Sequence, residues 1–370
     1  MRGMLQQLRV AGFPGRYLQG PGALEALPDV ARELGGSRLL LVSDDVVQRA
    51  LGQRFEAQLS GSPLACVRLR FGGECTRRAI EDLAGQARRA SGDLVVALGG
   101  GKTIDTAKGV AKALGIPLIV APTIASNDSA TSRLIVLYDD AHRLLDVELM
   151  TRNPDAVLVD TAELARAPLR YCRAGMGDAL SKAFEAAQCA RAGGINFHGG
   201  RPPRAARLLG DHCYAVLQEL GEVATADVSR GSPSEAVEDV IEATVLLSGL
   251  AFESGGLSIA HALLRGLSTV PALDRSLHGE MVSFGTLVQV VLEQRPAAWI
   301  EQHLELMQRL GLPGTLAALG KEALSAGELA AVVARTLAAP YIGNFDRPLD
   351  AARLGQAVLE ADALGRSILP

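Results

Sequence analysis

The sequence of 370 residues is poor in cysteine, and the cysteines it contains are scattered. Cys66, Cys75, Cys172, Cys189 and Cys213 form no C-x-x-C pair, so their spacing predicts neither a disulfide framework nor a zinc site built from thiolates. Residues 1–20 contain no continuous apolar segment of the kind found in secretory signals. We therefore expect reduced thiols and a cytoplasmic protein.

Long apolar runs and an excess of one charge are also absent. No run reaches the roughly 18 apolar residues that a membrane-spanning helix needs. The 37 basic and 41 acidic side chains give a net charge of −4, which provides no general attraction to nucleic acid or to an anionic membrane. We expect no nucleic-acid and no membrane partner. Because aromatic residues make up only 4% of the chain, the core must be built mainly from aliphatic side chains.

The residues that are present divide the chain into two regions of different pattern. Up to residue 160, short apolar runs alternate with amphipathic segments, which favours an α/β fold with a parallel sheet and helices on both faces. The expected strands are 38–43, 65–70, 93–98, 117–121 and 157–160, and the expected helices are 44–59, 77–90 and 102–114. Beyond residue 160 strand patterns almost vanish, and helical periodicity dominates to the end of the chain. The expected helices there include 235–252, 255–267 and 281–293.

A glycine-rich turn follows the expected strand at 93–98. In LVVALGGGKTIDTAK, three glycines and Lys102 connect this strand to a helix. Glycine lets the backbone approach a phosphate closely, and the free N–H groups at a helix start attract an anion. The turn matches neither a Walker loop nor G-x-G-x-x-G. Its place at the carboxyl end of a strand still favours a phosphate site, because ligands of open α/β sheets bind at that edge.

Asp44 directly follows the expected strand at 38–43. A carboxylate at this place can accept hydrogen bonds from the ribose hydroxyls of adenosine, and it would repel a 2′-phosphate. An equally good interpretation is that Asp44, or a neighbour, is the N-cap of the next helix. Both interpretations stay open at the level of sequence.

Two of the six histidines lie beside glycines in apolar helical segments, which is an unusual setting for histidine. They are His261 in ESGGLSIAHALLRGL and His278 in SLHGEMVSFG. Asp178, in GMGDALSKAFE, has a similar apolar setting. Two imidazoles and one carboxylate are a suitable ligand set for catalytic zinc or ferrous iron. The alternative is that each is a hydrogen-bonded core residue, and spacing alone does not show that the three converge.

Six sequence blocks in register resemble the glycerol dehydrogenases of the iron-containing (group III) alcohol dehydrogenase superfamily. The blocks are GGECTRRAI at 72–80, GGGKTIDTAK at 99–108, APTIASNDSATS at 121–132, GMGDAL at 175–180, ESGGLSIAHALLRGL at 253–267 and HGEMVSFGTLVQ at 278–289. The resemblance implies a Rossmann-like NAD-binding α/β domain at 1–160. It also implies an all-helical metal-binding and substrate domain at 161–370, the architecture shared with dehydroquinate synthases. A divalent metal, zinc or else iron, is implied in the cleft between the domains.

The resemblance also implies residue roles. Asp178, His261 and His278 fall on the metal ligands of the family, which contact the substrate through the metal, and Asp128 falls on the aspartate that touches the polyol. Asp44 falls on the adenosine-ribose contact. The other implied NAD contacts are Gly100, Gly101, Lys102 and Asp105 at the pyrophosphate turn, and Thr123, Ser126, Ser132, Leu134 and Tyr138 beyond it. The last three alternate as residues on one face of a strand do.

The sequence departs from the family pattern around the substrate aspartate and near the C-terminus. Asn127, Ser129 and Ala130 replace the usual Thr, Ala and Pro, and the segment YIGNFDRP at 341–348 replaces a His-Asn-Met-Pro-like segment. Arg133 replaces a small residue, and strand alternation directs it away from the cofactor side. These departures affect the expected substrate more than the expected metal and NAD sites.

The function implied by the resemblance is oxidation of glycerol, or of a related small vicinal diol, with NAD⁺ as the hydride acceptor. The glycerol product would be dihydroxyacetone. Alternatives within the superfamily are dehydrogenases for another polyol or a 2-hydroxy acid. More distant alternatives are a dehydroquinate-synthase-like lyase and an NAD-binding protein without activity. The resemblance further implies a homo-oligomer, often an octamer.

Overall fold

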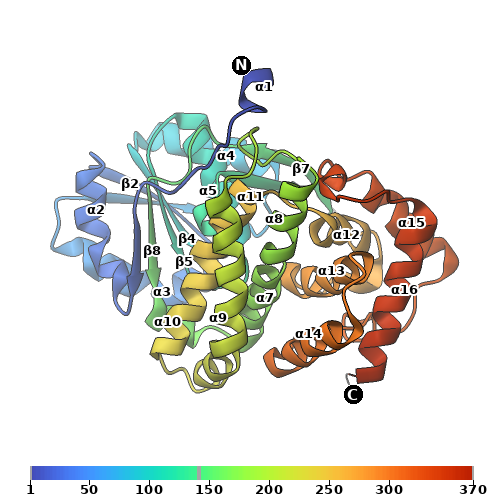
Figure 1. Cartoon of the computed structure of the whole chain (residues 1–370). Helices are drawn as coiled ribbons and strands as arrows, with labels where there is room; N and C mark the ends of the chain where they lie inside the picture. The colour runs from blue at the N-terminus through green and yellow to red at the C-terminus, as the bar shows by residue number, and fades with distance from the viewer. Residues whose placement is uncertain (1, 140–142, 369–370) are drawn as a thin grey trace.

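The N-terminal part of the chain is built around a parallel sheet. The computed structural model describes residues 2–139 and 143–368. Six strands pair in the order β1-β8-β5-β4-β2-β3, and all neighbours are parallel (Figure 1). The strands are β1 (Tyr17–Gly20), β2 (Arg38–Ser43), β3 (Ala65–Arg70), β4 (Leu94–Gly99), β5 (Leu118–Pro122) and β8 (Ala156–Asp160). The expected strands 38–43 and 65–70 have these bounds, whereas β1 was not predicted.

Helices cover both faces of this sheet, as the sequence pattern predicted. They are α2 (Leu27–Glu33), α3 (Asp45–Ser60), α4 (Arg77–Ala90) and α5 (Gly101–Leu114). Consecutive side chains of β2 point to opposite faces. Leu39 and Leu41 join the apolar cluster that contains residues of α2 and α3, and Leu40 and Val42 join the cluster that contains residues of α4 and α5. Because both faces are covered, the central strands are continuous apolar runs.

A short antiparallel hairpin separates the last two strands of the sheet. It consists of β6 (Leu134–Tyr138) and β7 (Leu144–Leu149), and a 3₁₀ turn at Ser129–Thr131 precedes it. Leu134 and Tyr138 lie on β6, but Ser132 lies before the strand begins, so the three do not share one strand as expected.

From Thr161 onward the described elements are helices, which lie beside the sheet (Figure 1). Most of their buried apolar side chains join the cluster that also contains Leu40 and Val42 of β2. They are α6 (Thr161–Arg166), α7 (Leu169–Leu180), α8 (Lys182–Arg191), α9 (Arg204–Ser229), α10 (Glu235–Ile241), a π-helical turn (Glu242–Leu247), α11 (Ser248–Gly255), α12 (Ile259–Leu267), α13 (His278–Leu292), α14 (Ala297–Leu310), α15 (Ala326–Leu337) and α16 (Ala351–Ile368). The helix expected at 255–267 begins only at Ile259, because Gly256 turns the chain with a φ of 87°.

A helix that crosses a membrane must be both long and predominantly apolar. Within residues 2–139 and 143–368, no single helix is long and apolar enough to cross one. Glu235–Gly255 and Ile259–Leu267 reach that length and composition only when taken together, with a bend of 98° between them.

Candidate active site

Three predicted metal ligands come together where α7, α12 and α13 meet. Asp178 lies in the last turn of α7, His261 lies in the first turn of α12, and His278 is the first residue of α13. Each offers one ligand atom, and these atoms all lie within 4.8 Å of one another. Asp178 Oδ1 is 3.3 Å from His261 Nε2 and 3.6 Å from His278 Nε2. Residues far apart in the sequence thus form one cluster.

The chemistry of this cluster fits a divalent cation. Asp178 is fully buried, and its Oδ2 atom has no hydrogen-bond partner in the described structure. A buried carboxylate oxygen without a partner is costly unless a cation compensates it. The side chain of His278 is 38% exposed, so the cluster is accessible on one side. Two imidazoles and one carboxylate with an open side are typical of catalytic metal sites.

Glu185, in α8, fixes the orientation of His261. Its Oε2 lies 2.6 Å from His261 Nδ1, and its Oε1 accepts hydrogen bonds from the backbone N–H groups of Ser258 and His261. Burial alone would raise the pKa of Glu185, but the nearby imidazole of His261 and the ammonium of Lys182 hold that pKa below its ordinary value. A carboxylate at Nδ1 leaves Nε2, the atom that faces Asp178, free to bind a metal.

Lys182, the first residue of α8, brings a positive charge into the cluster. Its Nζ lies 2.5 Å from Asp178 Oδ1, 3.2 Å from Asp128 Oδ2 and 3.3 Å from His261 Nε2. Burial would lower the pKa of Lys182, but Asp128, Asp178 and then Glu185 outweigh burial and raise it. Conversely, burial would raise the pKa of Asp178, and Lys182 is the main cause that holds it well below its usual range.

Asp128, the predicted polyol contact, lies beside the metal cluster on the loop between β5 and β6. It is buried, and its Oδ2 accepts a hydrogen bond of 2.6 Å from Ser248 Oγ at the start of α11. The same loop reaches the glycine turn, because a side chain at Gly101 would collide with Asn127. The consecutive residues Asn127 and Asp128 of this loop therefore lie at the predicted cofactor turn and beside the predicted metal cluster, respectively.

The glycine turn has the form expected of a phosphate-binding helix start. Gly100 is the N-cap of α5, and no side chain caps the helix. The first N–H groups of α5 therefore have no side-chain acceptor and are suited to bind an anion. The Nζ atom of Lys102 donates to Glu74 Oε2 at 2.7 Å and lies 4.8 Å from the centre of the Tyr138 ring.

Asp44 and Asp105 both have structural partners. Asp44 is the N-cap of α3, where its Oδ1 accepts a hydrogen bond of 2.8 Å from Val47 N. This is the capping role that the sequence left open, and it does not test the ribose contact. Asp105 is buried, and its two oxygens accept from Lys108 Nζ and from Val136 N, each at 3.0 Å. Burial raises the pKa of Asp105 despite the charge of Lys108.

The remaining predicted cofactor residues lie in the segment that follows the carboxyl end of β5. Thr123 N donates to Gly99 O at 3.1 Å, and Ser126 lies in the loop that leads to Asp128. Ser132 is buried, with its Oγ 3.4 Å from Lys108 Nζ. Leu134 O accepts from the same Nζ at 2.7 Å. Their roles as NAD contacts stay predictions.

Two of the departures from the family pattern, Arg133 and the segment 341–348, make structural contacts with buried residues. The Arg133 guanidinium lies 3.4 Å from buried Glu253 and donates to Phe197 O at 2.6 Å. The segment 341–348 packs under α12, where the hydroxyl of Tyr341 donates to His261 O at 3.1 Å and Asn344 Nδ2 donates to Leu257 O. This segment supports the helix turn that carries His261.

Sequence reasoning missed Lys182, Glu185 and Ser248. A signal for two of them was present, because Asp178, Lys182 and Glu185 are three charged residues at i, i+4 and i+7 in an otherwise apolar segment. This spacing predicts side chains on one face of a continuous helix, although the structure divides it at Ser181 into α7 and α8. Ser248 had no comparable signal, since its contact with Asp128 joins residues 120 positions apart.

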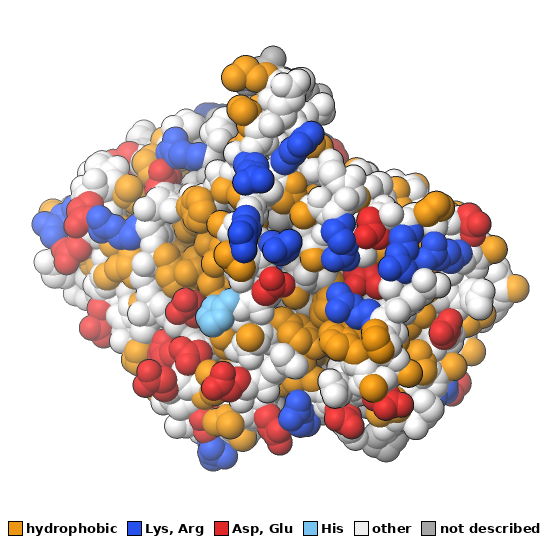
Figure 2. All heavy atoms as spheres, viewed as in Figure 1, with side chains coloured by type: hydrophobic (Ala, Val, Ile, Leu, Met, Phe, Trp, Pro, Cys, Tyr) orange, Lys and Arg blue, Asp and Glu red, His pale blue; other side chains and the backbone are white. Residues whose placement is uncertain are grey.

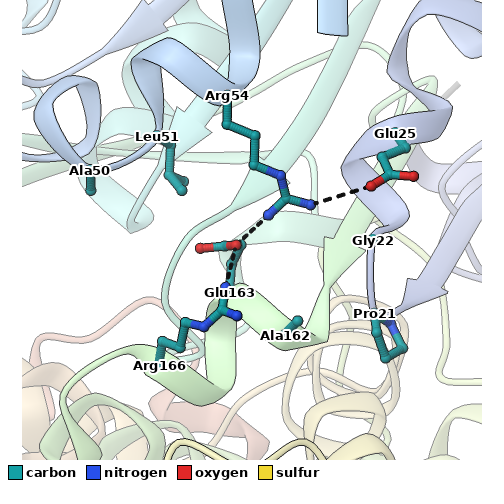
Figure 3. Close-up of a pocket in the computed structure, with 9 residues that line it drawn as sticks. All are labelled: Pro21, Gly22, Glu25, Ala50, Leu51, Arg54, Ala162, Glu163 and Arg166. Atoms are coloured by element: carbon teal, nitrogen blue, oxygen red, sulfur yellow. Dashed lines mark hydrogen bonds and ion pairs between the residues drawn. The ribbon is translucent and has the colours of Figure 1, made fainter. Parts of the chain in front are cut away.

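Two surface hollows are distinct from this cluster. One, of about 900 Å³, lies beside the carboxyl ends of β1 and β8, and none of the predicted site residues lines it (Figure 3). Its charged side chains satisfy one another, because Arg54 pairs with Glu25 and Glu163, and Glu163 pairs with Arg166. Figure 2 shows basic side chains gathered below helix α1 (Arg2–Leu5). A hollow of about 430 Å³ at the start of α9 is lined by Arg9, Arg201, Arg204 and Arg207.

Similarity to known proteins extends over nearly the whole chain. Residues 14–161 match the family described as iron-containing alcohol dehydrogenase. A glycerol dehydrogenase of Thermotoga maritima is 39% identical over 355 residues, which cover 96% of this chain and 97% of the relative. A glycolaldehyde reductase of Halobacterium salinarum is 38% identical, covering 96% of this chain and 97% of the relative.

Solved structures agree with these sequence relationships. The crystal structure of a probable glycerol dehydrogenase from Sinorhizobium meliloti 1021 is 37% identical. It superposes with a TM-score of 0.92 over 98% of this chain and 100% of that structure. The expected fold class is thereby confirmed. The chain belongs to the glycerol dehydrogenase group of the iron-containing alcohol dehydrogenase superfamily, a group of metal-dependent alcohol dehydrogenases.

Proposed function

We propose that this protein oxidises glycerol, or a closely related vicinal diol, to the corresponding hydroxyketone with NAD⁺. With glycerol the products are dihydroxyacetone, NADH and a proton. The observation that carries the proposal is the convergence of Asp178, His261 and His278 beside Asp128, on the loop that also reaches the glycine turn. The names of the relatives support the same reaction class.

We propose that the metal is zinc and that Asp178, His261 and His278 hold it. Two imidazoles and one carboxylate also suit iron, but three protein ligands with one open side are the usual arrangement of catalytic zinc. When bound, such a cation lowers the pKa of a coordinated hydroxyl and polarises the developing carbonyl, while NAD⁺ accepts the hydride. Glu185 contributes by keeping His261 Nε2 directed at the cation.

The other residues bind and orient the two reactants. We propose that Asp128 accepts a hydrogen bond from a substrate hydroxyl, with Ser248 holding its carboxylate in place. A fixed diol presents one carbon to the nicotinamide, which is the main requirement for hydride transfer. NAD would lie along the carboxyl ends of the strands. The proposed contacts are Asp44, Gly100, Gly101, Lys102, Asp105, Thr123, Ser126, Ser132, Leu134 and Tyr138.

The proposal extends to the organisation of the molecule. We assign residues 1–160 to NAD binding and 161–370 to metal and substrate binding, in accord with the change from sheet to helices after Asp160. All five cysteines are unpaired and four are buried, which supports a reducing, cytoplasmic location. Exposed apolar side chains at Met4, Leu8 and Phe13 support assembly into a homo-oligomer. Sedimentation analysis would measure the mass of the assembly in solution.

The first test is NADH formation from glycerol before and after chelation. Purified protein is assayed with glycerol, propane-1,2-diol and 2-hydroxy acids at saturating NAD⁺, then treated with chelator and resupplied with zinc. We expect turnover of vicinal diols that is lost on chelation and restored by zinc. Turnover of 2-hydroxy acids alone would contradict the proposed substrate. If none of these compounds gave net formation of NADH, the assignment as a dehydrogenase would be contradicted.

A substitution in the ligand set tests the assignment at residue level. We expect His261→Ala to lose diol oxidation and zinc binding together, because one of three ligands is removed. His303→Ala is the matched control, since His303 is also buried but stacks between Trp299 and Tyr214, outside the ligand set. Unchanged zinc content and turnover in His261→Ala would contradict the assignment.

A further inference from the structure

The ammonium of Lys182 contacts two of the three residues of the candidate metal site. Its Nζ lies 2.5 Å from Asp178 Oδ1 and 3.3 Å from His261 Nε2. Asp178 Oδ1 and His261 Nε2 are also the atoms by which these two residues approach each other, at 3.3 Å. A divalent cation held by Asp178 and His261 would lie close to this ammonium, whichever carboxylate oxygen it used, and the two charges would repel strongly because the site is buried and poorly screened.

The charge of Lys182 is compensated by neighbouring protein groups and not by solvent. Its side chain is 0% exposed. Two stabilising groups lie within its present reach. Asp128 Oδ2 is 3.2 Å from Nζ, and the ring of Phe252 lies 5.6 Å away, at cation–π distance. A small movement of the side chain would therefore exchange Asp178 for Asp128 without exposing or neutralising the charge.

We propose that Lys182 is an internal cation that competes with the metal. In the metal-free protein it compensates the charges of Asp178 and Asp128, which otherwise face each other in a buried cluster. Binding of a divalent cation displaces the ammonium from Asp178 Oδ1 towards Asp128. The loaded site then carries a lysine–aspartate pair where the proposed diol contact lies. This inference rests on the metal site of the proposed function.

The proposal predicts that Lys182 stabilises the metal-free protein and at the same time lowers its affinity for the metal. Lys182→Met removes the charge and keeps an apolar chain of similar length. We expect the variant to bind Zn²⁺ more tightly than the wild type, by about tenfold or more, because the competing charge is gone. We also expect its metal-free form to melt at a lower temperature, because two buried carboxylates lose their counter-charge. Zinc should therefore raise its melting temperature more than that of the wild type.

Lys108→Met is the matched control. Lys108 is also fully buried, and it pairs with Asp105 at 3.0 Å, but neither residue offers an atom to the metal cluster. The control should melt at a lower temperature with unchanged Zn²⁺ affinity. Both variants and the wild type are titrated with Zn²⁺ against a chromophoric chelator, after removal of metal and without NAD.

The outcomes separate this inference from the metal site itself. Zn²⁺ affinity in Lys182→Met that equals or falls below that of the wild type would overturn the competition and leave the site intact. Failure of both proteins to bind Zn²⁺ would overturn the site and the inference together. Binding by Lys182→Met alone would support the inference in its strongest form.

A second measurement needs no variant. Crystal structures of the wild-type protein are determined after chelation and after zinc soaking. We expect Lys182 Nζ within hydrogen-bond distance of Asp178 Oδ1 in the metal-free crystal, and next to Asp128 in the zinc-loaded crystal. The same position of Nζ in both crystals would overturn the proposal, even if Lys182→Met failed to fold.

Discussion

Glu185 illustrates how one side chain outside the proposed ligand set orients a proposed ligand. It contacts the His261 ring at Nδ1 and the backbone N–H groups of Ser258 and His261. The carboxylate therefore fixes both the position of the first turn of α12 and the tautomer of the imidazole. A neutral side chain of the same shape would keep part of the hydrogen bonding and lose the charge.

Glu185→Gln should therefore weaken Zn²⁺ binding by about 10- to 100-fold, the usual effect of removing the partner of a ligating histidine. Chelator competition measures this affinity. Glu293→Gln is a suitable control, because Glu293 is also buried and pairs with Arg295 at 2.8 Å, but it lies at the other end of α13. Wild-type affinity in Glu185→Gln would contradict the positioning role.

At the scale of elements, the site depends on the close approach of α7 and α13. A Cβ atom on Gly279 would lie 1.7 Å from Ala174 O and 3.0 Å from Asp178 N. The backbones of the two helices are therefore in contact directly beside His278 and Asp178. Glycine is required here because the neighbouring helix backbone occupies the space of a side chain.

Gly279→Ala should separate the two helices and lower both stability and Zn²⁺ affinity. We expect a loss of about 2 kcal/mol or more in the free energy of unfolding, as for overpacked cores. Urea unfolding and chelator competition measure the two effects. Gly327→Ala, in α15, meets no atom within 4 Å and should be neutral or slightly stabilising. Equal behaviour of the two variants would contradict the backbone contact.

At the scale of the molecule, the loop after β5 joins the sheet to the helical region. It carries Asn127 against Gly101 in one direction and Asp128 against Ser248 and Lys182 in the other. Thr131 Oγ1 donates to Val245 O, a carbonyl of the π-helical turn that precedes α11, at 3.0 Å. Short π-helical segments of this kind are frequent at functional sites.

Stability of the whole molecule should depend on pH through a buried histidine away from the site. Burial, with a smaller effect of Arg295, lowers the pKa of His303 to about 4. The unfolded chain takes up this proton near pH 6.5. The stabilisation from neutral His303 is therefore present above about pH 6.5 and is lost as the pH falls towards 4.

Urea unfolding at pH 7 and pH 5.5 tests this dependence. The wild type should lose about 1 kcal/mol more between these values than His303→Gln, which has no proton to take up at this position. Other titrating groups act in both proteins and cancel in the comparison. An equal loss in both proteins would show that His303 does not carry the effect.

Much of the fold could be predicted from local sequence pattern. The strands 38–43 and 65–70 and the helix 77–90 match the described bounds, because apolar period and capping residues such as Thr76 act over a few residues. A strand through residues 132–138 was expected, and β6 spans Leu134–Tyr138, but its antiparallel partner β7 was not predicted. The convergence of Asp178, His261 and His278 was expected from family resemblance, whereas Lys182, Glu185 and Ser248 were not predicted at all.

The sequence by itself determined the α/β and helical regions, the glycine turn after β4 and the family to which the chain belongs. The two regions follow from short-range periodicity, and the family follows from six sequence blocks that occur in the family's order along the chain. Only the tertiary structure decided that Ser248 donates to Asp128, that Glu185 contacts His261, and that Lys182 contacts Asp128. The reason is physical: hydrogen bonds and charge contacts between distant residues depend on how helices pack, and helix packing is set by the whole core.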